Sequence, residues 1–176
     1  MNKLSKISKI SLFLFVVSGA VWLGSYMTRL SLFYQIFQPA EFVLKDFFND
    51  QNLTGIFQTL IAAVTINIIF YIVMIVTFIL FILTSKLNLK QNGWLFISTV
   101  LIFISLPFEL YLMFIDYKLV IMVFNGNFNS QEVLKLVIKR FTVLSSFPIV
   151  EILSYFAVIY LFLFQPLQGT NRKLVE

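Results

Sequence analysis

Long runs of apolar residues alternate with short polar segments along the whole chain. Four of these runs reach the length of about 20 residues that a helix needs to cross the hydrocarbon core of a bilayer, which is about 30 Å thick. Their approximate bounds are 10–30, 56–84, 94–116 and 141–164. Peptide groups inside a bilayer have no water molecules as hydrogen-bond partners. Each run must therefore form a helix, in which the peptide groups bond to one another. The pattern predicts an all-α integral membrane protein, a four-helix transmembrane bundle that occupies 1–176 as one domain.

The first run has two interpretations. Lys3, Lys6 and Lys9 precede it, and a cleaved signal peptide also begins with basic residues before an apolar stretch. The apolar stretch of a signal peptide is only about 7–15 residues long. Here it continues through Trp22 and Leu23. We therefore expect a retained first span rather than a cleaved leader.

Two of the polar connections contain amphipathic segments. In the first, Glu41 to Phe48 mixes charged and aromatic residues and is predicted to be a short helix at the membrane surface. In the second, Glu132 to Arg140 repeats apolar residues at helical spacing and predicts another interfacial helix. Asn129, three residues before Glu132, is typical of a capping box at a helix start. This helix is expected to continue into the fourth span, where Pro148 predicts a kink.

Composition excludes a water-soluble domain. The chain is 60% hydrophobic and 12% charged, with a mean hydropathy of +0.93, whereas soluble domains carry about 25% charged residues. It contains no Cys and no His. Disulfides, thiol nucleophiles, common zinc sites and Ser-His or Cys-His dyads are therefore excluded. The 22 Phe are expected mainly on lipid-facing surfaces.

The net charge of +5 is not concentrated in a nucleic-acid-binding patch, because the basic residues lie singly between apolar runs. If both termini are cytoplasmic, the inner side carries seven basic residues and the outer side six. The seven are Lys3, Lys6, Lys9, Lys86, Lys90, Arg172 and Lys173. This small excess, with most acidic residues outside, favours cytoplasmic termini in a cell membrane, as in a bacterial inner membrane. The cluster around Lys139 opposes that orientation.

Two carboxylates, Glu109 and Glu151, lie inside apolar runs, where a charged side chain is costly and usually functional. At 1.5 Å per helical residue, Glu109 lies roughly 22 Å from the start of its span and Glu151 roughly 20 Å from the end of its own. Both are thus predicted at one level in the outer half of the bilayer. Asn67 reaches a similar level, and Arg29 can extend inward as a counter-ion. These four residues form the candidate intramembrane polar cluster.

The cluster leaves three functions open. The favoured function is a non-enzymatic small subunit or packing partner of a membrane assembly, in which interhelical hydrogen bonds or ion pairs order the bundle, because few polar residues are expected in the interior. Two carboxylates that share a proton or hold a cation predict instead a small proton- or cation-coupled transporter. An intramembrane enzyme is the least favoured, since no substrate pocket, phosphate-binding loop or metal motif is present in the sequence. We expect no catalytic residues, no cofactor and no metal site, and as partners the lipid bilayer and other membrane subunits or further copies of the chain.

Overall fold

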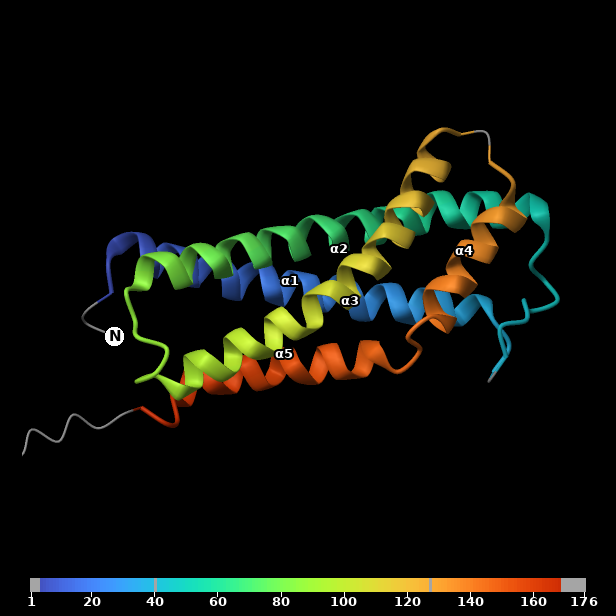
Figure 1. The fold of residues 1–176 in the computed structure, drawn as a ribbon. Helices are drawn as coiled ribbons and strands as arrows, with labels where there is room; N and C mark the ends of the chain where they lie inside the picture. Colours follow the sequence, from blue (N-terminus) through green and yellow to red (C-terminus); the bar gives the residue numbers. More distant parts are fainter. Residues whose placement is uncertain (1–3, 40, 127, 169–176) are drawn as a thin grey trace, which may run out of the picture.

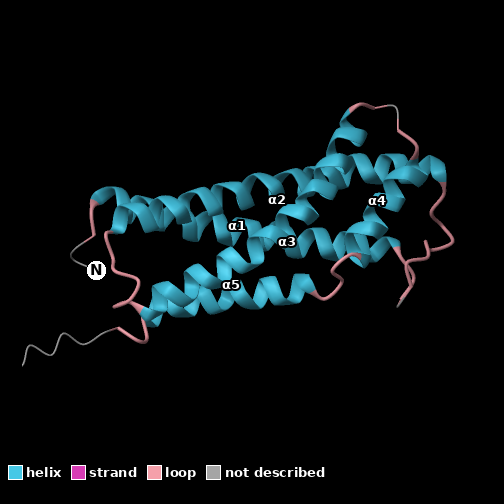
Figure 2. Cartoon of the chain, viewed as in Figure 1, coloured by secondary structure: helices cyan, strands magenta, loops and turns pink. Residues whose placement is uncertain are grey.

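The described part of the chain is folded almost entirely into helices. The computed structural model describes residues 4–39, 41–126 and 128–168, so the predicted polar tail with Arg172 and Lys173 lies outside the described residues. The helices are α1 (Lys6–Ile36), α2 (Asp50–Ser85), α3 (Gly93–Phe124), α4 (Ser130–Thr142) and α5 (Phe147–Phe164). Of these, α1, α2, α3 and α5 are long and apolar enough to cross a membrane. The predicted all-α fold with four long apolar helices is confirmed, and Figure 2 shows its loops confined to the two ends of the bundle and the α4–α5 connection.

Two pairs of helices pack closely, α1 with α2 and α3 with α5, and α3 also packs on α2 of the first pair. Helices α1 and α2 are antiparallel and pack along most of their length, while α3 crosses them diagonally (Figure 1). The first half of α3 packs on α5, and its second half reaches α2 and α4. The Ser8 hydroxyl donates a hydrogen bond to Thr84 Oγ1 at 3.2 Å, which joins the start of α1 to the end of α2. At the opposite end, the hydroxyls of Thr54 and Ser130 lie 2.8 Å apart and join α2 to α4.

Polar side chains define where the helices begin. The Asn49 side chain accepts hydrogen bonds from the first turn of α2, and the Asn52 side chain accepts one from the Asn49 N–H, which completes a capping box. Before α4, the Asn129 side chain accepts from the Gln131 N–H. The predicted helix start at Asn129 is therefore confirmed. The reciprocal bond from Glu132 is not found among the described contacts.

Three helices are longer than the apolar runs suggested. Helix α1 continues to Ile36, α2 already begins at Asp50, and α3 continues to Phe124. With 36 residues, α2 is about 54 Å long, well beyond the thickness of a bilayer core. The helix of the third span continues past the predicted span end at 116, because Asp116 lies about two turns before the end of α3 and is buried.

Two further predictions are wrong. Residues 41–48 do not form a helix, because the chain folds back on the end of α1. The Gln38 N–H bonds the Val43 carbonyl at 2.8 Å, and the Lys45 N–H bonds the Ile36 carbonyl at 3.1 Å, so these peptide groups are satisfied without a helix. Pro148 does not kink a continuous fourth span either. It lies in the first turn of α5, where a missing N–H costs nothing.

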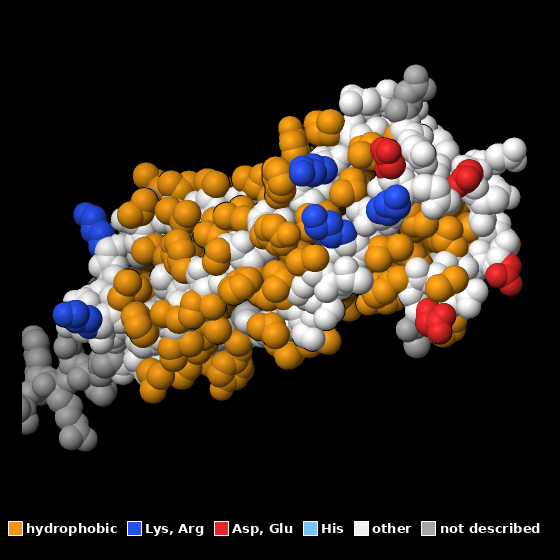
Figure 3. All heavy atoms as spheres, turned by 45° about the vertical axis from the view of Figure 1, so that its right-hand side comes forward, with side chains coloured by type: hydrophobic (Ala, Val, Ile, Leu, Met, Phe, Trp, Pro, Cys, Tyr) orange, Lys and Arg blue, Asp and Glu red, His pale blue; other side chains and the backbone are white. Residues whose placement is uncertain are grey.

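Large hydrophobic side chains cover the outside of the bundle. They spread over most of the face in Figure 3, and Leu83, Phe124 and Leu163 are each at least 70% exposed. The basic and acidic side chains visible in that view are concentrated toward the ends and around α4. Inside, aromatic and aliphatic residues fill the space between the helices, with Trp22, Tyr26 and Phe78 almost fully buried. An exterior this apolar is disfavoured in water and suits a lipid environment.

Candidate functional site

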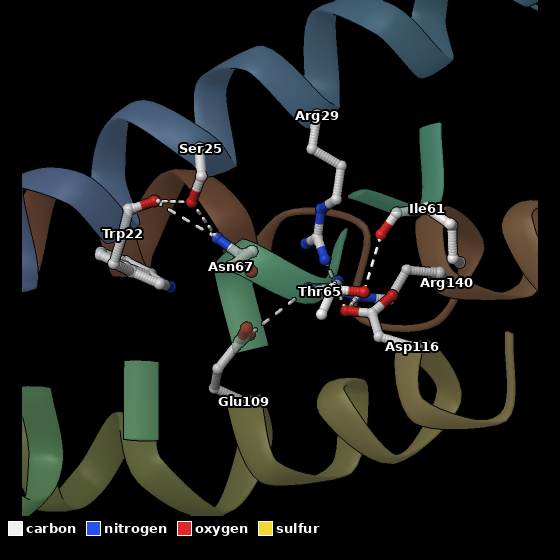
Figure 4. A network of polar contacts seen from close by, with 9 residues as sticks. All are labelled: Trp22, Ser25, Arg29, Ile61, Thr65, Asn67, Glu109, Asp116 and Arg140. Carbon is white, nitrogen blue, oxygen red and sulfur yellow. Dashed lines mark hydrogen bonds and ion pairs between the residues drawn. The ribbon is translucent and has the colours of Figure 1, made fainter. Parts of the chain in front are cut away.

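A network of buried charged side chains lies where α1, α3 and α4 meet (Figure 4). Arg29 Nη1 donates to Asp116 Oδ2 at 2.6 Å. Arg140 donates to the same oxygen through Nε at 3.2 Å, and its Nη2 reaches Glu109 Oε2 at 3.4 Å. Each of these four residues is at most 5% exposed. The network thus joins three helices through ion pairs shielded from solvent.

Helical spacing explains how each element presents its charged group. Glu109 and Asp116 are seven residues apart in α3, which is two turns, so both lie on the face toward α4. In α4 the buried face includes Val133, Val137 and Arg140 at the spacing i, i+4, i+7. Arg140 therefore lies on the buried face of α4, although its charge would place it on the polar face of an interfacial helix.

The ring of Tyr26 lies beside both cations. The Arg29 guanidinium carbon is 4.8 Å from the ring centroid, and that of Arg140 is 6.0 Å away. Such positions favour a cation–π interaction that partly compensates for lost hydration. Burial by itself lowers the pKa of Arg140, but Asp116 and Glu109 raise that pKa overall, so the guanidinium stays charged.

Glu151 of α5 lies beside the network and forms no ion pair with the described residues. Its carboxyl group is within interaction range of that of Glu109. Both of its oxygens are buried and lack a hydrogen-bond partner among the described residues, as does Glu109 Oε1. Glu151 also lines a cavity of about 20 Å³ with Trp22, Tyr71 and Tyr155. A space of that size accommodates a single water molecule.

The fourth residue of the predicted cluster, Asn67, lies in a separate set of contacts. Its side-chain NH₂ donates to the Trp22 carbonyl at 3.3 Å and to Ser25 Oγ at 3.2 Å, which joins α2 to α1 (Figure 4). Asn67 Oδ1 is buried and has no partner among the described residues. The structure therefore brings Arg29, Glu109 and Glu151 together and places Asn67 beside them, outside the ion pairs.

The charge balance of the network decides what it can do chemically. Two guanidiniums face three carboxyl groups, of which Asp116 is paired with both cations. With every group ionised, one negative charge would be buried without compensation, which is strongly unfavourable. A neutral network holds one proton, and the position left for it is the Glu109–Glu151 pair. Binding or losing that proton changes the charge of the site by one.

Asp116 and Arg140 are missing from the cluster predicted from the sequence. Asp116 was assigned to the end of a span because Tyr117 and Lys118 follow it. The spacing of seven from Glu109 and the register of Arg140 with Val133 could have identified both residues. Comparison with protein-family models, curated proteins and solved structures found no match for this chain. The interpretation of the site therefore depends on its geometry alone.

Proposed function

We propose that this chain is a multi-pass membrane protein of the cell membrane that acts as a small proton-coupled carrier, with the Glu109–Glu151 pair as its proton-binding site. The observation that carries the proposal is the third buried carboxyl group, Glu151, beside a neutralised set of ion pairs. Ionisable residues inside membrane spans are rare and typically belong to proton or ion pathways.

The surroundings of Glu151 support a site that exchanges protons. The small cavity offers space for a water molecule next to its carboxyl group. Arg140 contacts Glu109, so loss of the proton strengthens the attraction between α3 and α4 and its uptake weakens that attraction. A proton can in this way change how the two helices pack, which a coupled carrier requires.

A second candidate function is a non-enzymatic packing subunit of a membrane assembly. The closed set of ion pairs among Arg29, Asp116, Arg140 and Glu109 favours it, because such pairs fix the register of three helices. Sequence considerations favoured this function because few polar residues were expected in the interior. The buried carboxyl group of Glu151, which has no hydrogen-bond partner among the described residues, shifts the balance toward the carrier.

The two functions differ in what Glu151→Gln does. The substitution removes a titratable group that makes no ion pair, so in a carrier it abolishes pH-driven proton flux into liposomes while the unfolding midpoint in detergent is retained. Glu109→Gln removes a partner of Arg140 and lowers both flux and stability. Glu132→Gln, on the exposed face of α4, is the matched control.

Three results would contradict the carrier. They are wild-type flux in Glu151→Gln, absence of flux in the parent chain, or flux that follows a sodium gradient instead of a proton gradient. Retained flux in Glu151→Gln would remove Glu151 from the proton pathway, absence of flux in the parent chain favours the packing subunit, and flux driven by sodium favours a cation-coupled carrier.

A further inference from the structure

A second hollow lies at the end of the bundle opposite α4. It has a volume of about 680 Å³, within the range of ligand pockets. Its walls come from the start of α1, the end of α2 and the facing ends of α3 and α5, and most of them are apolar. The residues that line it include Leu4, Leu12, Val16, Phe81, Trp94 and Phe162. We call this space the end cleft.

The end cleft is elongated along α1. Leu4 and Val16 both line it, and twelve residues of chain, helical from Lys6 onward, correspond to about 18 Å. Val16 on one side and Leu163 on the other are 44% and 73% exposed, so the cleft opens sideways between α1 and α5 onto the apolar exterior. A space of this shape suits a single hydrocarbon chain aligned with the helices.

The mouth of the end cleft is polar, and the end of the bundle at which it opens is positively charged. The side chains of Asn92, Gln165 and Gln168 line it on the side of the chain connections. Among the described residues, every charged side chain at this end is basic, while the described acidic residues of the loops and of α4 lie at the opposite end. The basic residues are Lys6, Lys9, Lys86 and Lys90, and all four are exposed. The charge is thus complementary to an anionic headgroup.

Trp94 forms part of the wall of the end cleft. Trp94 is 3% exposed, and its indole N–H has no hydrogen-bond partner among the described residues. The ring packs edge-on against Phe162 at 5.1 Å between centroids, which fixes its position in the wall. The ring thus contributes an apolar surface to the wall of the cleft, which an acyl chain can contact.

From these features we infer that the end cleft binds an anionic phospholipid, with one acyl chain between α1 and α5 and its phosphate at the lysines of the α2–α3 connection. Basic pockets between membrane helices bind anionic headgroups in this way on the cytoplasmic side of membranes. The inference depends on the membrane location within the proposed function, and it is independent of the proton-binding role of Glu151.

The chain offers a direct test, because Trp22 and Trp94 are its only tryptophans. In Trp22→Phe, the fluorescence of Trp94 reports on the end cleft alone. The full-length variant is placed in phosphatidylcholine vesicles that contain a minor fraction of lipid brominated on its acyl chains. Brominated phosphatidylglycerol is expected to quench Trp94 more strongly than brominated phosphatidylcholine at the same fraction.

Charge variants then separate a specific site from general lipid contact. Lys86→Gln and Lys90→Gln are each expected to reduce the preference for phosphatidylglycerol about fivefold. The matched pair Lys135→Gln and Lys139→Gln, exposed on α4 at the other end, is expected to leave it unchanged. Equal quenching by both lipids, quenching by neither, or an unchanged preference in the Lys86 and Lys90 variants would overturn the inference.

If Trp22→Phe fails to fold, the parent chain provides a second measurement. Added phosphatidylglycerol is expected to raise its unfolding temperature in detergent more than added phosphatidylcholine, since a ligand that binds only the folded state stabilises it. Equal shifts with the two lipids would overturn the inference as well.

Discussion

At the scale of single residues, one oxygen of Asp116 balances two cations. Its Oδ2 accepts hydrogen bonds from Arg29 of α1 at 2.6 Å and from Arg140 of α4 at 3.2 Å. Loss of one member of a buried ion pair leaves a charge without compensation and typically costs about 3–5 kcal/mol. We expect Asp116→Asn to lower the free energy of unfolding in detergent by about that amount, measured by chemical denaturation.

Asp46→Asn provides the control for that measurement, since Asp46 is exposed in the α1–α2 connection. Its free energy of unfolding is expected to stay within about 0.5 kcal/mol of the parent value. If the two Asn variants were equally stable, the ion pairs of Asp116 would contribute nothing to folding.

The distance in sequence between its partners explains why Asp116 was not predicted as part of the site. Arg29 and Asp116 are 87 positions apart, and no local pattern indicates that they meet. The apolar context of Glu109 and Glu151 did identify these carboxyl groups as buried. For Asp116, the neighbouring Tyr117 and Lys118 gave the segment the character of a span end, and only its ion pairs with Arg29 of α1 and Arg140 of α4 override that local character.

At the scale of helices, the approach of α1 to α5 depends on Gly19. A Cβ added there would overlap the phenol ring of Tyr155, whose hydroxyl donates to the Val16 carbonyl at 3.4 Å. We expect Gly19→Ala to destabilise the bundle by about 1–3 kcal/mol, because the rigid ring must move away. Thermal unfolding in detergent measures the effect.

Gly24 provides a matched comparison on the same helix. It is exposed, and nothing lies within 4 Å of an added Cβ. Gly24→Ala is expected to leave stability unchanged or to raise it by up to about 1 kcal/mol, because alanine has the higher helix propensity. A loss of stability at Gly24 equal to that at Gly19 would contradict the role assigned to close helix contact.

The break between α4 and α5 contains a strained residue. Leu144 has φ of +57°, which costs a residue with a Cβ about 1–2 kcal/mol, and its side chain is 37% exposed. We expect Leu144→Gly to raise the unfolding temperature, since glycine adopts this conformation freely. Ser146→Gly is the control, because its φ of −89° carries no such strain, and a gain there of the same size would contradict the prediction.

The sequence was most informative for the helices and least informative for the segments between them. Apolar runs of membrane length identify the long helices because period and length agree over many residues. The segment 41–48 is too short to determine its own structure. The end of α1 supplies the carbonyl and amide partners with which this segment folds back. Taken alone, Pro148 is compatible with either a kink or a helix start. The turn at Leu144 interrupts the chain before it, so Pro148 becomes part of a helix start.

At the scale of the whole molecule, the burial of two arginines strengthens the prediction that both termini are cytoplasmic. Six basic residues were assigned to the outer side, but Arg29 and Arg140 are buried in the ion-pair network. Only four remain available to influence orientation, against seven on the side of the termini. The positive-inside rule then favours cytoplasmic termini more strongly than the sequence count did.

The absence of cysteine from the chain makes this orientation directly testable. Gln91→Cys places one thiol in the exposed α2–α3 connection, and Asp46→Cys places one in the exposed α1–α2 connection at the other end of the bundle. With cytoplasmic termini, a membrane-impermeant maleimide added to intact cells labels the thiol at 46, whereas the thiol at 91 reacts only after permeabilisation. The reverse pattern would invert the orientation and place the end cleft in the outer leaflet. Labelling of both thiols in intact cells would mean that the long helices do not separate the two connections across a membrane, and the proposed carrier would lose its physical basis.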